Sequence, residues 1–156
     1  MFQTKITKML GIKYPIVVGT MMYLARAEMV AAASNAGALG ILGSANFGTK
    51  EEFREELKKL KGMTDKPFAV NLNLFPMRRP VDNREYMGIL VGEGVKIVET
   101  SGHRAPEDLA RDLKAHGVTL IHRCVGVRYA LKAQAIGADA VTVVGYESGG
   151  AREPWM

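Results

Sequence analysis

The sequence is poor in features that would point to a secreted or membrane protein. It has a single cysteine, Cys124, among 156 residues, so no disulfide can form within the chain and a reducing compartment is the natural setting. No apolar run approaches the ~20 residues that a membrane-spanning helix needs, and the first residues lack the apolar core of a signal peptide. We therefore expect a cytoplasmic protein without a membrane partner.

Common cofactor and nucleotide motifs are also missing. No Gly-x-Gly-x-x-Gly follows the first expected strand and no phosphate-loop lysine motif occurs, which weakens a dinucleotide-fold or NTPase interpretation. His103 and His122 have no second ligand at metal-like spacing, so we expect no metal site. The net charge of +5 would favour an anionic cofactor or substrate, but both signs alternate along residues 50–59 and no basic stripe for nucleic acid is present.

What the chain does contain is a repeated unit. Four times a helix-like segment ends at a glycine and leads into a β-branched apolar segment, at Gly37, Gly94, Gly117 and Gly137. Glycine just past a helix takes the left-handed conformation that ends it, and the following runs are short enough for strands buried on both faces. The repeat predicts alternating helices and strands.

The remaining segments complete this alternation. Strands are expected at residues 15–19 and 67–72, and helices at 26–35, 83–91 and 128–136. Two further helices are expected, one beginning after Thr49 and one beginning at Pro106. Thr49 and Glu52 have the spacing of a capping box, and Phe53, Leu57 and Leu60 share one helical face that ends near Gly62.

Six strands with five intervening helices predict an α/β fold with a parallel sheet. The sheet is either an open doubly wound sheet or part of a (βα)8 barrel. In both architectures ligands bind beyond the carboxyl ends of the strands.

The last motif is the most informative one. Residues 137–150 read as a buried strand that ends in Gly149-Gly150. Glycine lets bare backbone N–H groups approach an anion or a flat ring closely. The pair is equally compatible with a flexible terminus.

Four segments together resemble the nitronate monooxygenases, formerly called 2-nitropropane dioxygenases. They are Gly19-Thr20-Met21, residues 68–72, His122-Arg123-Cys124 and residues 137–150. This family consists of FMN-dependent (βα)8 barrels related to flavin-dependent enoyl-acyl-carrier-protein reductases. The resemblance covers about residues 12–150 and implies a parallel TIM-barrel type of fold with six of its eight βα units, a domain of residues 1–150 and a tail of residues 151–156.

The resemblance also implies a flavin site. FMN would lie across the carboxyl ends of the strands, with the Asn71 amide at the polar edge of its ring. The other implied contacts are backbone at Gly19, Thr20, Met21, Gly149 and Gly150, and the side chains of His122 and Arg123 at the rim. The family has a histidine after the glycine pair, where this chain has Ala151, so no catalytic residue is assigned.

Residues 151–156 do not resemble the family, and we expect a chain shortened by truncation or a change of reading frame. The phosphate-binding loops of such barrels usually follow strands seven and eight. The activity that the resemblance implies is oxidation of an alkyl nitronate or nitroalkane with O2 to a carbonyl compound and nitrite. Alternatives are an NAD(P)H-dependent reductase of the enoyl-thioester type and a non-catalytic fragment. Unpaired edges of an open barrel would favour a homo-oligomer.

Three residues have structural interpretations. Cys124 is expected to be a small buried residue rather than a nucleophile. Asp139 precedes its strand, at the end of the sheet associated with stability. Met21, with Met22, would be assigned to the core on composition alone, and only the resemblance places it at the flavin.

Overall fold

Six parallel strands form one sheet in the order of the sequence. The computed structural model describes residues 3–75, 82–102, 106–145 and 147–148. The strands are β1 (Val17–Val18), β2 (Leu39–Gly43), β3 (Phe68–Asn73), β4 (Ile97–Ser101), β5 (Thr119–Cys124) and β6 (Ala140–Val143). Each strand pairs with the next one along the chain. The predicted α/β class is confirmed, and the strands form a half-barrel of the TIM type.

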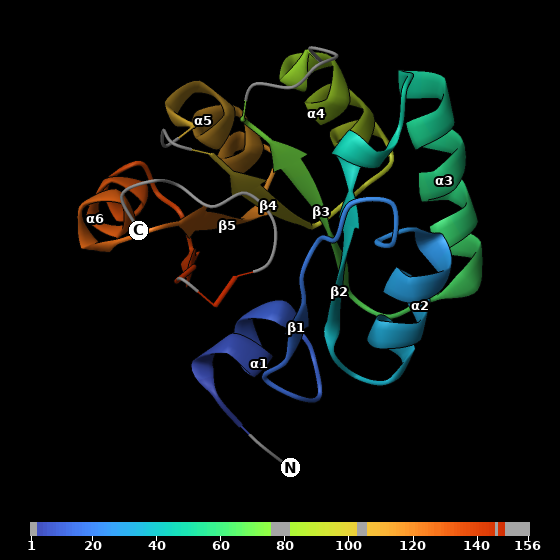
Figure 1. Ribbon diagram of the computed structural model, residues 1–156, viewed down its shortest axis with the longest axis horizontal. Coiled ribbons are helices and arrows are strands. Elements are labelled where there is room, and N and C mark those ends of the chain that lie inside the picture. The colour runs from blue at the N-terminus through green and yellow to red at the C-terminus, as the bar shows by residue number, and fades with distance from the viewer. Residues whose placement is uncertain (1–2, 76–81, 103–105, 146, 149–156) are drawn as a thin grey trace.

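Among the described residues, five helices lie along the outer side of this half-barrel, and a sixth lies near the amino ends of the strands (Figure 1). The outer helices are α2 (Ala27–Asn35), α3 (Lys50–Met63), α4 (Asn83–Gly92), α5 (Glu107–Ala115) and α6 (Val127–Ala135). A short 3-10 turn, η1 (Ser44–Asn46), follows β2. The predicted helices are all present, with bounds that differ by one or two residues. No helix in the described ranges is long and apolar enough to cross a membrane.

Helix α1 (Lys5–Leu10) was not predicted. Thr4 caps it by accepting a hydrogen bond from the Thr7 N–H, and Gly11 ends it with a φ of 67°. Only Thr7 and Leu10 of this helix are buried. Six residues with two buried positions are too few to produce a helical period in the sequence.

The predicted capping box of α3 forms only in part. The Thr49 side chain accepts a hydrogen bond from the Glu52 N–H at 3.1 Å, as expected. The Glu52 carboxylate accepts from the Gly48 N–H at 2.8 Å, one residue before the predicted donor. The backbone N–H groups of Glu52 and Gly48 therefore both have side-chain acceptors at the start of the helix. Phe53, Leu57 and Leu60 are fully buried, which confirms the predicted face.

The two faces of the sheet carry separate apolar clusters. Leu42, Val70, Val98 and Leu120 pack with the outer helices. Ile41, Ala69, Ile97 and Ile121 point to the inner face, together with Leu10 and Ile12 from α1 and the segment after it. Successive residues of a strand point to opposite faces, so this division assigns a face to every residue at the carboxyl ends.

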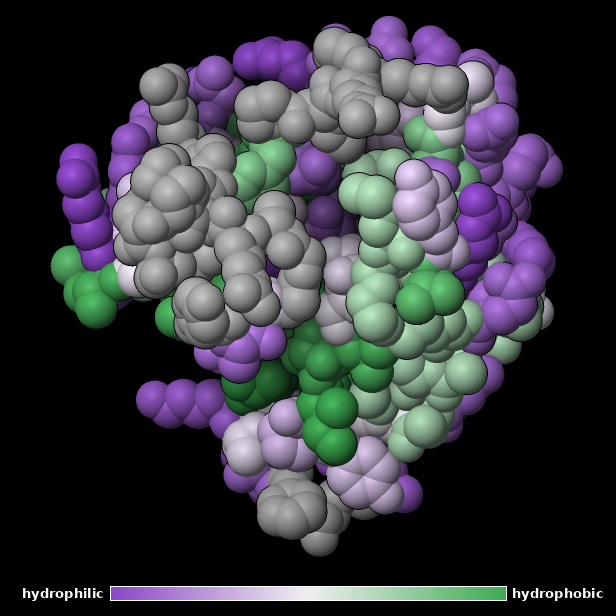
Figure 2. Space-filling view, in the orientation of Figure 1, coloured by the Kyte–Doolittle hydropathy of each residue, from purple (hydrophilic) through white to green (hydrophobic). Residues whose placement is uncertain are grey.

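Several large apolar side chains remain exposed at the two edges of the sheet. They are Ile16 and Val17 at β1, Val141 and Val143 at β6, and Val127 and Leu131 on α6. Figure 2 shows hydrophobic surface in the lower middle of the view, over the region of β1 and α1 in Figure 1. Parallel sheets are usually covered on both sides and at their edges, which makes these two edges unusual surfaces.

Candidate functional site

Polar side chains gather on the inner face at the carboxyl ends of β3, β4 and β5. Asn71 lies in register with Glu99, and Ser101 lies in register with Arg123. Side chains two residues apart in a strand share a face, so Glu99 and Ser101 belong to the same surface. The predicted residues Asn71 and Arg123 therefore meet around the carboxylate of Glu99, for which the sequence predicts no role.

Hydrogen bonds connect this group. The Asn71 amide nitrogen donates to Glu99 Oε2 at 2.7 Å and to Ser101 Oγ at 3.2 Å. The Arg123 guanidinium donates to the same Glu99 oxygen at 3.2 Å and forms an ion pair with it. One buried carboxylate oxygen thus holds side chains from the strands on either side of β4.

Burial raises the pKa of Glu99 above its ordinary value, because the charged form loses its hydration. The Arg123 charge and the hydrogen bonds from Asn71 and Arg123 act in the opposite direction. The side chain of Glu99 is 1% exposed, whereas that of Arg123 is 24% exposed. Arg123 is therefore the member of the pair that a ligand can reach.

Arg123 retains an unused donor. Its Nε atom is buried and has no hydrogen-bond partner within the described residues. A buried donor without an acceptor is rare in folded proteins and calls for an explanation. One explanation is a ligand acceptor that binds at this position.

The segment after β1 also lies beside the Arg123 guanidinium. A Cβ at Gly19 would lie 3.1 Å from a terminal nitrogen of Arg123, so the guanidinium packs against bare backbone. The first and fifth strands are not neighbours in the sheet. Only the curvature of the half-barrel brings Gly19 and Arg123 together.

Asn46 holds the rest of this segment in place. Its side chain accepts from the Tyr23 N–H at 2.9 Å and donates to the Ala25 carbonyl at 3.2 Å. Tyr23 has a φ of 66°, which is uncommon for a residue other than glycine and is typical of functional loops. Thr20 lies beside Gly43 and is partly exposed, and Met21 is 40% exposed. Met21 is therefore not a core residue, and it is available to a ligand.

His122 lies on the opposite face of β5 from Arg123. Its ring Nδ1 is 2.9 Å from Thr100 Oγ1, and the two residues are in register on the helix side of the sheet. His122 is 1% exposed, and burial lowers its pKa. The structure does not bring His122 together with Asn71, Glu99 and Arg123, and its contact with a cofactor stays a prediction.

The buried His122 should make the fold sensitive to acid. Because its pKa is lowered in the folded protein, the unfolded chain binds a proton that the folded protein does not as the pH falls below 6.5. We expect this residue to lower the free energy of unfolding by up to about 1.4 kcal/mol for each pH unit below that value. Chemical denaturation at pH 7 and pH 5 should show that His122→Gln loses less free energy of unfolding between these two pH values than the wild type does. His116→Gln, at an exposed position, is the control, and equal losses in all three proteins would contradict this expectation.

Two structural assignments are confirmed. Cys124 is buried and free. Asp139 accepts a hydrogen bond from the Leu120 N–H and forms an ion pair with Lys114, at the amino end of β6. Gly149, Gly150 and Ala151 lie outside the described residues, so their predicted roles stay predictions.

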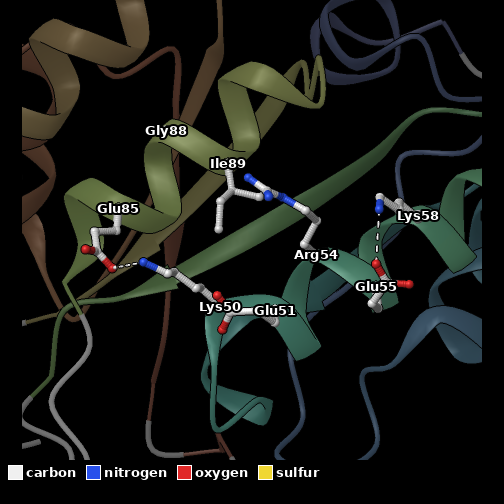
Figure 3. Close-up of a pocket in the computed structure, with 8 residues that line it drawn as sticks. All are labelled: Lys50, Glu51, Arg54, Glu55, Lys58, Glu85, Gly88 and Ile89. Carbon is white, nitrogen blue, oxygen red and sulfur yellow. Dashed lines mark hydrogen bonds and ion pairs between the residues drawn. The ribbon is translucent and has the colours of Figure 1, made fainter.

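A second concave surface lies away from the strand ends. Figure 3 shows a groove between α3 and α4 that is lined by charged side chains, four of which form two ion pairs. Lys50 contacts Glu85 at 3.4 Å, and Lys58 contacts Glu55 at 3.0 Å. Such exposed pairs are solvated surface features. Among the described residues, no three histidine, cysteine or acidic side chains are placed to hold a metal ion.

The inner-face group fits the polar edge of a flavin ring. Asn71 has an amide that can both donate and accept, Arg123 has an unpartnered Nε–H, and Gly19 gives bare backbone beside it. These groups come from three segments at the carboxyl ends of the strands, where (βα)8 barrels bind their ligands.

Comparisons with known proteins find relatives over nearly the whole chain. The chain is 36% identical, over 97% of its length, to the (3aS,4S,5R,7aS)-5-hydroxy-7a-methyl-1-oxo-octahydro-1H-indene-4-carboxyl-CoA dehydrogenase of Mycobacterium tuberculosis, of which it covers 41%. It is 29% identical, over 95% of its length, to the nitronate monooxygenase of Pseudomonas aeruginosa, of which it covers 52%. The chain thus spans about half the length of the curated relatives it matches.

A solved structure has a similar fold. FabK from Thermotoga maritima superposes with a TM-score of 0.87 at 32% identity, over 96% of this chain and 46% of that one. The sequence model of the family described as nitronate monooxygenase matches residues 3–155. The chain therefore belongs to the nitronate monooxygenase family, whose members are flavin-dependent oxidoreductases.

Proposed function

We propose that this chain binds FMN on the inner face of its half-barrel, at the carboxyl ends of β1, β3, β4 and β5. The observation that carries the proposal is the meeting of Asn71, Glu99 and Arg123 with the backbone at Gly19. Asn71 and Arg123 would hold the polar edge of the ring, while Gly19, Thr20 and Met21 would lie along it. The flavin, when bound, supplies the electron transfer, and the protein supplies binding and orientation.

The reaction that we propose is the oxidation of an alkyl nitronate by O2 to a carbonyl compound and nitrite. The family match over residues 3–155 supports this choice. The positive net charge of +5 is compatible with an anionic nitronate as substrate. Within the site, Arg123 is a cation whose side chain is partly exposed.

A flavin-dependent oxidoreductase of acyl thioesters is the second candidate. A relative at 36% identity carries the name of a carboxyl-CoA dehydrogenase, whereas the nitronate monooxygenase of Pseudomonas aeruginosa is 29% identical. This candidate includes reduction of an enoyl thioester with NAD(P)H. It would use the same flavin position and differ in the substrate.

One set of measurements distinguishes these functions. The purified chain is reconstituted with FMN, and its absorbance spectrum reports whether the flavin is bound. Nitrite release from an alkyl nitronate supports the monooxygenase, and NAD(P)H oxidation that depends on an enoyl thioester supports the second candidate. A colourless protein that FMN leaves unchanged would refute both.

We also infer that the chain associates with itself through its exposed sheet edges. Val143 is 62% exposed on β6, an edge strand, and exposed strand edges pair readily with other chains. We expect sedimentation to show a dimer or larger species at micromolar concentration. Val143→Lys should shift the population toward monomer, because a lysine on an edge strand opposes pairing. A wild-type chain that sediments as a monomer would overturn this inference.

A further inference from the structure

We propose that Glu99 is a positioning residue that holds the Arg123 guanidinium in place for an acceptor oxygen of the flavin. This inference rests on the proposed FMN site and adds to it a residue whose side chain is almost inaccessible to a ligand. Glu99 is 1% exposed, so it acts through its neighbours.

Different atoms of Arg123 contact Glu99 and remain available to a ligand. Glu99 Oε2 accepts from a terminal nitrogen of Arg123, and the same nitrogen packs against Gly19. One end of the guanidinium is thereby fixed between a carboxylate and bare backbone. The Nε–H belongs to a different nitrogen of the same planar group, and it is buried and has no partner in the described ranges. A planar group fixed at one end presents its remaining donors in a defined direction.

The unpartnered donor determines the kind of ligand atom. A guanidinium carries donors only, so the ligand atom opposite the Nε–H must be a hydrogen-bond acceptor, and a carbonyl or anionic oxygen is an acceptor of this kind. The pyrimidine edge of a flavin ring carries carbonyl oxygens, and this edge gains negative charge when the ring is reduced. Arg123 would therefore contact that edge, beside Asn71, which shares Glu99 as its hydrogen-bond acceptor.

Glu99 also limits the net charge of the site. With Glu99 ionised, the Glu99–Arg123 pair is neutral overall. A ligand that accepts from Nε–H is therefore held by the direction of this hydrogen bond more than by the charge of the guanidinium. If Glu99 acted only as a counter-charge, its removal would strengthen the binding of an anionic ligand. If Glu99 positions Arg123, its removal weakens binding, and an uncharged acceptor of the same shape restores it.

The test compares Glu99→Leu with Glu99→Gln. Leucine removes the acceptor, whereas glutamine keeps an oxygen that can accept from Arg123 and Asn71. We expect the FMN dissociation constant to rise about tenfold or more in Glu99→Leu and to return near the wild-type value in Glu99→Gln. Glu93→Gln is the matched control, because it removes a carboxylate from the Lys61–Glu93 ion pair outside the site.

A double-mutant cycle with Arg123→Met tests whether Glu99 acts through Arg123. In the Arg123→Met background, Glu99→Leu should have little further effect on FMN binding. The double variant also guards against misfolding, because replacing both members of a buried ion pair is tolerated better than leaving one charge alone. An undiminished effect of Glu99→Leu in that background would overturn the proposal, as would equal affinities of Glu99→Leu and Glu93→Gln.

A second readout does not require bound flavin. The Arg123 Nε–H gives a 1H–15N resonance, assigned by its loss in Arg123→Met, and a held guanidinium should keep this signal sharp in the wild type and in Glu99→Gln. We expect the signal to broaden in Glu99→Leu and to shift when FMN is added to the wild type. A signal unaffected by Glu99→Leu overturns the positioning role. If FMN does not bind the wild type, the proposed function and the ligand assignment fail, while the effect of Glu99→Leu on the resonance still decides whether Glu99 holds Arg123.

Discussion

With saturating FMN, nitrite release from a preformed alkyl nitronate is expected to exceed release from the neutral nitroalkane by roughly 10²–10⁴. The resemblance to the family places its histidine at Ala151, a position outside the described residues. A methyl group cannot remove the α-proton of a nitroalkane, and loss of a general base typically lowers a rate by this factor. A preformed nitronate has already lost that proton, so its oxidation does not require the base.

The assay measures initial rates of nitrite release from both forms of one substrate at the same pH and FMN concentration. Ala151→His should narrow the difference by raising the nitroalkane rate and leaving the nitronate rate nearly unchanged. Equal rates of both forms in the wild type would show that the catalytic position has been assigned wrongly. Nitrite release from neither form would favour the thioester candidate or a non-catalytic chain.

Gly40→Ala is expected to destabilise the fold by about 3 kcal/mol, at the upper end of the usual range for overpacked positions. A Cβ on Gly40 would lie 2.4 Å from the carbonyl oxygen of Val30, in the backbone of α2. Backbone cannot rotate away as a flexible side chain can, so the whole helix would have to move from the sheet. At this chain length the change corresponds to a fall in Tm of roughly 6–12 °C.

Gly88→Ala is the matched control for Gly40→Ala. Gly88 lies within α4, and a Cβ there would meet nothing within 4 Å. Alanine in a helix interior is favoured over glycine by about 0.5–1 kcal/mol, so this variant should be as stable as the wild type or more so. Urea denaturation followed by circular dichroism measures both variants. A Gly40→Ala protein as stable as Gly88→Ala would mean that α2 does not pack on β2 as closely as described.

Most of the fold could be predicted from local sequence signals. Gly37, Gly94, Gly117 and Gly137 all have positive φ, as expected for glycines that end helices before a strand. These signals act over a few residues and need no knowledge of the tertiary structure. Helix α1 is the exception, because its few buried positions leave no period to detect.

The candidate site could be predicted less completely, because it depends on which face each residue occupies. Strands buried on both faces have no alternation of apolar and polar residues, so the sequence could not show which of the neighbours His122 and Arg123 faces the inner side of the sheet. Glu99 was overlooked for a related reason. Its significance comes from its neighbours on β3 and β5, and the register between strands is not encoded in any one segment. A carboxylate within the apolar run of β4 was the available signal.

The sequential strand order has a consequence for how the protein folds while it is being synthesised. Register partners such as Val17 and Leu39, or Ile121 and Ala140, are separated by roughly 20 to 30 residues, a moderate loop to close. Each strand can therefore join its predecessor soon after it leaves the ribosome. Gly19 and Arg123 are far apart in sequence, so their contact must wait until β5 has emerged. The nascent chain would thus acquire its sheet step by step, and the contact at the proposed flavin site only in one late step.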